Sequence, residues 1–284
     1  MSLSGNSLTE SEASLPRSGK APADDESAAI DMRQFVNSLA KGVSVLEAFS
    51  THPGPMSLQE IAGFAGLEKS TVQRMVYTLL QLGYLRKGLD GRGFCLGPRV
   101  LDRAFDFLRS WPLIERATPV INELQQTCHE RVDLSIFDDL TICYAIRRQS
   151  KRQTFYATLI GRRIPTYCSS GGRAIMARLT DAEVDSILRR SDLVALTPKT
   201  LVDPAEIRRQ IDRARKDGYS LVHDESQIGE VAVACAILDH RARPVAAIHI
   251  AGTLSEWSPD NFANRFAPLA AEAANALSGA FAPF

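Results

Sequence analysis

The sequence predicts a two-domain α/β protein, because two different patterns of elements follow one another along the chain. Its 284 residues are about twice the usual size of a domain. Amphipathic helices and one short hairpin are expected between residues 35 and 110, whereas residues 113 to 284 mix helices with strands in recurring hairpins. Recurring hairpins favour an antiparallel sheet flanked by helices over a βαβ repeat.

Composition and charge limit the class of protein. A hydrophobic fraction of 45% with 23% charged residues is typical of a globular protein without a membrane-spanning segment. Residues 1–30, which are rich in Ser, Ala, Pro, Gly and acidic residues, are expected to form a disordered tail without a secretion signal. Five scattered cysteines without a CxxC pair indicate reduced thiols and a cytoplasmic location. The formal net charge is zero, but residues 31–110 carry 10 basic and 7 acidic side chains, which is compatible with a polyanionic partner.

The first domain, residues 31–97, begins with three predicted helices. Apolar side chains recur at helical spacing over residues 35–50, 57–65 and 69–82. Ser57 with Glu60 three residues later forms a capping-box pattern at the start of the second helix. Gly66 is expected to make the turn into the third helix, and Gly83 to end that helix.

A glycine-tipped hairpin and a fourth helix follow. Residues 84–87 and 94–97 are predicted to form two short strands joined by the turn GLDGRG. Pro98 opens a helix that runs to about residue 110, and Trp111-Pro112 breaks it, so residues 98–112 lie between the two domains.

Three helices followed by such a hairpin form a winged helix-turn-helix, in which the third helix enters the major groove of DNA. This explains why that helix starts with Lys-Ser-Thr-Val-Gln-Arg. Ser70 and Thr71 can bind phosphates beside the helix start, whereas Gln73 and Arg74 can reach base edges. The residues predicted to bind double-stranded DNA are Lys69, Ser70, Thr71, Gln73, Arg74, Tyr77, Arg86, Lys87 and Arg92.

The second domain, residues 113–284, is expected to contain both helices and strands. Helices are predicted at residues 113–129, 172–179, 181–190, 204–217 and 259–280. Strands are predicted near residues 131–137, 140–147, 153–159, 219–224, 230–238 and 244–251.

The last two predicted strands each present a face of small residues. Alternation places Ala232, Ala234 and Ala236 on one face of the first strand. The second strand places His249 between Ala247 and Ala251. Small side chains beside a polar group can leave room for a ligand, but they can equally pack tightly against a helix. The residue pattern leaves both interpretations open.

Segments in both domains resemble one family. "MSLQEIAGFAGLEKSTVQRMVYTLLQLGYLRKG" and "FCLGPRVLDRAF" resemble the DNA-binding domain of IclR-type transcriptional regulators. "IGRRIPTYCSSGGRAIMA", "DGYSLVHDESQIGEVAVACAI" and "PVAAIHIAGT" resemble that family's effector-binding domain. The resemblance implies a dimeric or tetrameric repressor or activator of a catabolic operon with a pseudo-palindromic operator. It also implies a linker helix at 98–110 that aids dimerisation, and a GAF-like second domain that holds a small molecule.

The resemblance further implies an effector site before the helix at 172–179. Carried over by position, its residues are Tyr156, Ile164, Ser169, Ser170, Gly171, His223, Glu230, Ala232, His249 and Ala251. His223 lies near a position that is often acidic in the family, and so departs from the pattern. Two histidines beside a loop with free N–H groups suggest a small carboxylic acid. The segment "RRIPTYCSSGGRAIMA" is most similar to the branch that senses aromatic acids such as hydroxybenzoate or protocatechuate, or their ring-cleavage products.

The sequence also bears on three other functions. Cysteines and histidines are present, but no close ligand pair predicts a metal site, and no cofactor is expected. Cys168 with His249 as base would suggest a cysteine-dependent hydrolase, although no third orienting residue is recognisable. The second domain can also serve only as an oligomerisation scaffold.

Overall fold

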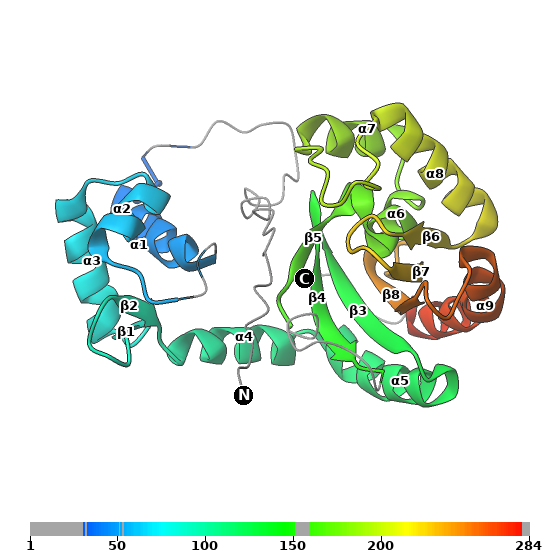
Figure 1. Cartoon of the computed structure of the whole chain (residues 1–284), viewed down its shortest axis with the longest axis horizontal. Coiled ribbons are helices and arrows are strands. Elements are labelled where there is room, and N and C mark those ends of the chain that lie inside the picture. Colours follow the sequence, from blue (N-terminus) through cyan, green and yellow to red (C-terminus); the bar gives the residue numbers. More distant parts are fainter. Residues whose placement is uncertain (1–30, 32, 51, 53, 151–159, 280–284) are drawn as a thin grey trace, which may run out of the picture. The chain divides into compact units, whose positions relative to one another are not determined.

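The computed structural model describes residues 31, 33–50, 52, 54–150 and 160–279 (Figure 1). These residues form two compact units that divide between Ser110 and Trp111. The expected tail at 1–30, the expected strand at 153–159 and Tyr156 lie outside the described residues. No helix in the described part of the chain is both long and apolar enough for a membrane crossing.

The first unit is built on the three predicted helices, α1 (Asn37–Glu47), α2 (Leu58–Ala65) and α3 (Lys69–Gln81). The first helix is shorter than expected, because its last turn, Ala48–Ser50, is a 3-10 helix. The apolar faces of the three helices share one small core with the hairpin that follows. Its largest members include Val45, Phe49, Met56, Ile61, Val72, Val76, Leu79, Leu85 and Phe94.

Local signals in the sequence fix the turn between α2 and α3. Ser57 Oγ accepts a hydrogen bond from the Glu60 backbone N–H, and Glu60 Oε2 accepts one from the Ser57 N–H at 2.7 Å. Gly66 ends α2 with a φ of 65°, a left-handed conformation that favours glycine. The predicted capping box and turn are therefore confirmed.

The hairpin consists of β1 (Leu85–Lys87) and β2 (Phe94–Leu96) in antiparallel register. Phe94 also exchanges two backbone hydrogen bonds with Met56, of 2.8 and 2.9 Å, which attach the hairpin to the segment before α2. Helix α4 (Arg99–Ser110) follows, and none of its residues is buried. Pro112 then begins α5 (Pro112–Cys128), as the Trp111-Pro112 break predicts.

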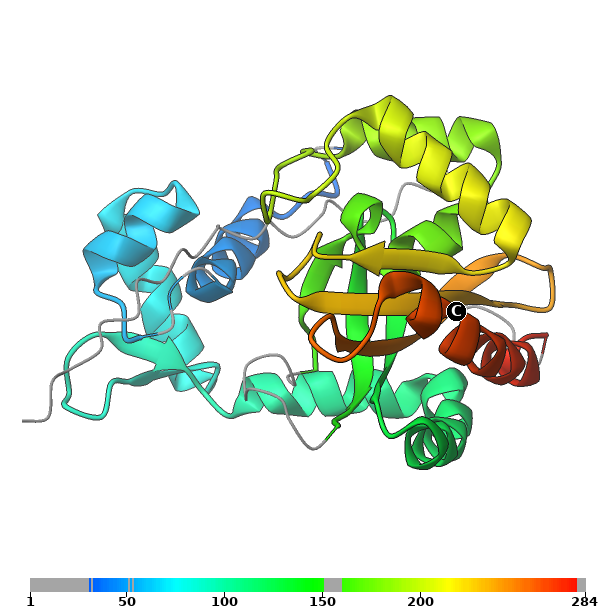
Figure 2. The same cartoon turned by 45° about the vertical axis from the view of Figure 1, so that its right-hand side comes forward.

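The second unit contains a six-stranded antiparallel sheet in the order β5-β4-β3-β8-β7-β6 (Figure 2). Its strands are β3 (Arg131–Asp138), β4 (Thr141–Arg148), β5 (Arg163–Pro165), β6 (Ser220–His223), β7 (Glu230–Leu238) and β8 (Pro244–Thr253). Strand β5 is not among the strands that the sequence predicts. Its three residues pair with β4 and so form one edge of the sheet.

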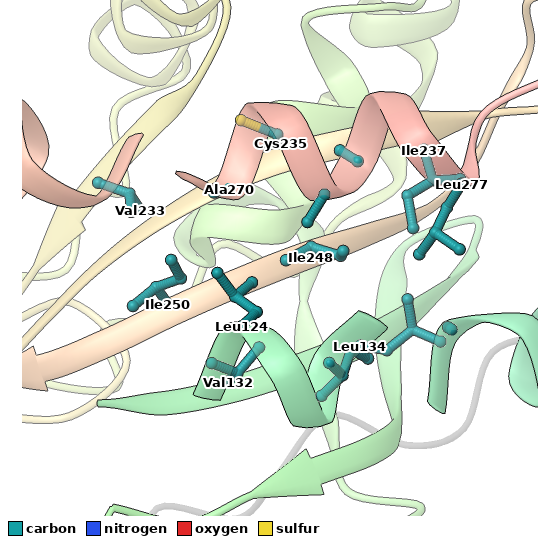
Figure 3. Close-up of a cluster of buried hydrophobic side chains, with 14 of the residues drawn as sticks. Leu124, Val132, Leu134, Val233, Cys235, Ile237, Ile248, Ile250, Ala270 and Leu277 are labelled. Carbon is teal, nitrogen blue, oxygen red and sulfur yellow. The ribbon is translucent and has the colours of Figure 1, made fainter. Parts of the chain in front are cut away.

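Helices cover both faces of this sheet. Helices α5 and α9 (Pro259–Leu277) cover the face that carries the alternate residues Val231, Val233 and Cys235 (Figure 3). Helices α6 (Ser170–Met176), α7 (Asp181–Arg190) and α8 (Pro204–Asp217) build a second apolar cluster on the other face. The alanine face of β7 therefore lies under α6, and both strand alternations that the sequence predicts are confirmed.

Helix α6 begins two residues earlier than the expected start at residue 172 and ends at Met176 rather than at residue 179. Ser169 is the cause, because its Oγ accepts a hydrogen bond from the Gly172 N–H at 3.2 Å and caps the helix. Ser170 and Gly171 are consequently helical residues rather than loop residues.

Candidate DNA-contact surface and effector cavity

Helix α3 separates its side chains into a buried and an exposed set. Val72, Val76 and Leu79 lie in the core. Gln73 and Arg74 are exposed, and Tyr77 is 64% exposed. At the helix start Lys69 and Ser70 are exposed and Thr71 is half-buried. The predicted contact residues thus share the solvent side of α3, and the side chains of Gln73 and Arg74 form no hydrogen bond or ion pair with another described residue.

The hairpin adds three exposed cations. Arg86 and Lys87 lie on β1, and Lys87 Nζ lies 4.2 Å from the centre of the Phe94 ring. Arg92 lies in the turn, where its backbone N–H donates to Asp90 Oδ1 at 2.9 Å. This bond orders the turn that presents the guanidinium. Exposed cations on a hairpin beside an exposed polar helix start are the features that a winged helix-turn-helix uses on DNA.

A small cavity lies between the start of α6 and the sheet in the second unit. Its volume is about 10 Å³, roughly the space of one water molecule. Seven predicted effector residues line it: Ser169, Ser170, His223, Glu230, Ala232, His249 and Ala251. Six further lining residues were not predicted from the sequence: Arg131, Tyr144, Val222, Asp224, Glu225 and Ser226.

The remaining predicted residues lie elsewhere. Ile164 is buried in the apolar cluster around α6, α7 and α8 and does not line the cavity. Gly171 packs directly against His249, because a Cβ built on Gly171 would lie 2.2 Å from His249 Cε1. Gly171 is therefore the residue that lets α6 approach the sheet. At this site some small residues line the cavity, whereas Gly171 allows α6 to pack closely against the sheet.

His249 is fully enclosed between two hydroxyl groups. Its Nε2 lies 2.7 Å from Ser135 Oγ and its Nδ1 lies 3.1 Å from Ser170 Oγ. Burial lowers the pKa of this imidazole to about 4, so it is neutral at physiological pH. A neutral imidazole gives His249 no charge with which to attract an acid. His223 is 47% exposed, with its Nδ1 3.6 Å from Asp224 Oδ2.

A buried ionic network forms the floor of the cavity. Asp133 accepts hydrogen bonds from Arg131 Nε at 2.9 Å and from Arg147 Nε and Nη2 at 3.1 and 3.0 Å. Arg131 also donates from Nη2 to Glu230 at 2.6 Å. Although burial opposes the charged form, Asp133 and Glu230 hold the pKa of Arg131 above its ordinary value. The signal in the sequence is a pair of charges two positions apart, Arg131 and Asp133, at the start of a predicted strand.

A second buried ion pair connects α6 to the loop between β6 and β7. Arg173 Nη1 and Nη2 donate to the two carboxylate oxygens of Glu225 at 2.6 and 2.7 Å. Arg173 Nε also donates to the Tyr167 carbonyl at 2.8 Å. Glu225 lines the cavity, so the position of α6 and the shape of the cavity depend on the same pair.

The structure does not support a cysteine nucleophile. Cys168 is fully buried, and burial raises the pKa of its thiol to about 12. The ring nitrogens of His249 bind Ser135 and Ser170 instead of this cysteine. In the part of the chain that the structure describes, no three His, Cys, Asp or Glu side chains gather to hold a metal ion.

Fold and site together define a two-domain transcriptional regulator with a helix-turn-helix and a sheet domain that encloses a small polar cavity. Residues 38–88 match the IclR helix-turn-helix domain, and residues 105–279 match the family described as "Bacterial transcriptional regulator IclR C-terminal". The chain belongs to the IclR family of bacterial transcriptional regulators. It is a regulator and not an enzyme, which excludes the hydrolase alternative.

Individual relatives agree with this assignment. The chain is 29% identical over 236 residues to the Pca regulon regulatory protein of Pseudomonas putida, covering 83% of this chain and 80% of the relative. It is 30% identical over 234 residues to the transcriptional repressor IclR of Escherichia coli, covering 79% of this chain and 83% of that protein. An IclR homolog from Microbacterium hydrocarbonoxydans, solved with 4-hydroxybenzoate, shares the fold with a TM-score of 0.70 at 24% identity, covering 85% and 97% of the two chains.

Proposed function

We propose that this regulator binds a pseudo-palindromic operator as a homodimer or homotetramer in the cytoplasm and controls a catabolic operon in response to a small carboxylic acid. The observation that carries the DNA-binding part is the exposed polar start of α3. Its polar side chains point to solvent while the apolar face of the same helix is buried in the core of the unit. The cationic hairpin follows directly in the chain.

In the proposed complex, α3 enters the major groove with its N-terminus first. Gln73 and Arg74 contact base edges, because an amide matches adenine and a guanidinium matches guanine. Lys69, Ser70 and Thr71 bind phosphates near the helix start, and Tyr77 lies one turn further along the same face. Arg86, Lys87 and Arg92 contact the backbone or the neighbouring minor groove.

Two substitutions test these roles. Arg74→Ala should weaken operator binding by about 1–3 kcal/mol and relax the preference at one base pair. Arg92→Ala should weaken binding to all sequences equally and reduce the slope of log K against log salt by roughly one. Arg209→Ala is the control, since Arg209 is 64% exposed on α8 and lies outside the proposed contact surface. Fluorescence anisotropy with operator and random duplexes measures all three. An unchanged base preference in Arg74→Ala would contradict the groove assignment.

Helix α4 supports the proposed oligomer. Leu101 and Phe105 are one turn apart, and they are 70% and 62% exposed. Val100, Ala104 and Leu108 extend the same apolar side at helical spacing. A second copy of α4 would cover this stripe in an isologous contact. Leu101→Glu should therefore lower the molar mass measured by light scattering, whereas Asp102→Glu on the same helix should leave it unchanged.

The acid effector is proposed from the relative that was solved with 4-hydroxybenzoate and from the Arg131 side chain that lines the cavity. A thermal-shift screen of small carboxylates, including 4-hydroxybenzoate and protocatechuate, tests it. A shift with one acid that disappears in His249→Ala would support a sensor. The volume of about 10 Å³ favours the second candidate, a domain used only for oligomerisation. That candidate predicts no shift and DNA binding that no acid alters.

A further inference from the structure

An ion pair lies across the small-residue face of the sheet. Arg131 on β3 donates from Nη2 to Glu230 Oε2 on β7 at 2.6 Å, although β8 lies between these two strands. Arg131 is in register with Ala251 of β8, and Ala251 is in register with Ala232 of β7, so the three side chains share one face. Glu230 precedes Ala232 by two positions and belongs to the same face. The two charged side chains therefore meet above β8, over the alanines.

This ion pair explains why the cavity is small. Small side chains on β7 and β8 leave room above the sheet, yet the remaining volume is about 10 Å³. Arg131 and Glu230 both line that space, and their side chains are 3% and 15% exposed. The room above the alanines is thus occupied by a guanidinium and a carboxylate of the chain itself.

The two partners of this ion pair are held to different degrees. Arg131 Nε donates to Asp133 at 2.9 Å, and Asp133 is itself held by two hydrogen bonds from Arg147. The guanidinium therefore keeps its position without Glu230. Glu230 begins β7 directly after Gly229, whose φ is 80°, and among the described residues its carboxylate accepts a hydrogen bond from Arg131 alone. Glu230 is consequently the partner that can leave.

We propose that the Glu230 carboxylate is an internal substitute for the effector, and that the carboxylate of the acid replaces it on Arg131 when the cavity widens. Arg131 then donates to the acid, while Asp133 continues to hold the guanidinium. The inference rests on the proposed function for the existence of an acid effector. It goes beyond that function by naming the group that binds the acid and the group that competes with it.

Charge favours exchange over simple addition. Asp224, Glu225 and Glu230 all line the cavity. An acid that entered while Glu230 stayed on Arg131 would add a further negative charge beside these three carboxylates. An acid that takes the place of Glu230 leaves the number of charges unchanged. A neutral ligand cannot replace Glu230 in this way, because it would leave the buried guanidinium without one of its two counter-charges.

Binding of 4-hydroxybenzoate and of its uncharged amide, 4-hydroxybenzamide, to the full chain tests this exchange by calorimetry. Glu230→Gln removes the competing charge and keeps the side-chain volume, so it should tighten binding of the acid by about 10-fold and leave binding of the amide unchanged. Addition of Arg131→Met should then weaken binding of the acid by about 10- to 100-fold relative to Glu230→Gln alone. Glu183→Gln is the matched control, because Glu183 pairs with Arg243 outside the cavity and should keep the wild-type affinity.

A second experiment does not depend on the identity of the effector. Glu230→Ala deletes the carboxylate and leaves space beside Arg131, so sodium acetate should raise the melting temperature of this variant by about 2–4 °C. Wild type in the same acetate, and the variant in sodium chloride of equal ionic strength, should show no such rise. An equal effect of acetate on the variant and on wild type would overturn Arg131 as the carboxylate site.

The binding results separate the exchange from the proposed function. Equal affinity of wild type and Glu230→Gln for 4-hydroxybenzoate would overturn the exchange, while leaving an acid effector in place. The same conclusion follows if Arg131→Met with Glu230→Gln binds the acid as tightly as Glu230→Gln alone. If neither wild type nor Glu230→Gln binds any acid of the thermal-shift screen, the acid effector and the exchange both fail.

Discussion

Gly171→Ala is the substitution for which the structure gives the most direct expectation. The new Cβ would lie 2.2 Å from His249 Cε1, 2.3 Å from Nε2 and 3.0 Å from Ser135 Oγ. Ordinary contact requires about 3.4 Å, so α6 or the imidazole must move by roughly 1 Å. Overpacking of this kind costs about 1–3 kcal/mol. Disturbing the bonds of His249 to Ser135 and Ser170 adds about 0.5–1.5 kcal/mol for each.

Urea unfolding of the full chain measures this loss. Both tryptophans, Trp111 and Trp257, lie in the second unit, so their fluorescence reports the unit that contains α6. The expected loss is about 2–6 kcal/mol in the free energy of unfolding. Gly63→Ala is the control, because a Cβ there meets nothing within 4 Å and Gly63 lies in the other unit, so the free energy of unfolding that the tryptophans report should keep its wild-type value.

The His249→Ala background separates steric conflict from other causes. Removing the imidazole opens the space that the new Cβ needs, so Gly171→Ala should cost much less in that background. A coupling energy above about 1 kcal/mol is expected in the double-mutant cycle. Wild-type stability of Gly171→Ala, or equal costs in both backgrounds, would refute the contact between α6 and His249 as the reason for glycine.

Two further predictions concern buried charges. The folded pKa of His249, about 4, lies below its ordinary value of 6.5, so the unfolded chain takes up this proton first as the pH falls. Wild type should lose roughly 3 kcal/mol from this residue between pH 6.5 and 4, and urea unfolding of His249→Gln against pH should lack that slope. Arg173→Met leaves the buried Glu225 carboxylate without its ion-pair partner and should lower the free energy of unfolding by about 3–5 kcal/mol in the same assay. The double substitution Arg173→Met with Glu225→Leu should regain most of this stability.

The parts of the fold that the sequence predicts are those set by local chemistry. The Ser57 cap, the left-handed Gly66 and the turn between β1 and β2 depend on residues a few positions apart, so their patterns predict them directly. Strand β5 has three residues and exists because it pairs with β4, a contact that no local pattern encodes. The start of α6 differs from the expected residue 172 because Ser169 caps the helix, so that the two glycines after Ser170 are helical.

The charged residues on the floor of the cavity could not be predicted from the sequence. Asp133 faces Arg147 and Ser135 faces Tyr144, and a register shift between Leu134 and Ser135 separates these pairs. Without that irregularity, Tyr144 and Arg147, at three positions apart, would lie on opposite faces of β4. The sequence therefore predicts the small-residue side of the cavity from β7 and β8, but not the aromatic ring and guanidinium from β4. When a contact between two side chains depends on one extra residue in a strand, the regular alternation of residues cannot predict it.

The small cavity has a consequence for how an effector would act. A space of about 10 Å³ admits no organic acid, so the arrangement described here cannot be the one that an effector binds. A ligand shifts an equilibrium only through its difference in affinity for two states. An acid that requires a wider cavity meets this condition, because it binds the open arrangement and is excluded from the closed one. Its apparent affinity then falls by the fraction of open molecules, and a substitution that loosens the closed cavity, such as Tyr144→Ala, should tighten acid binding even though it removes a ring from the wall.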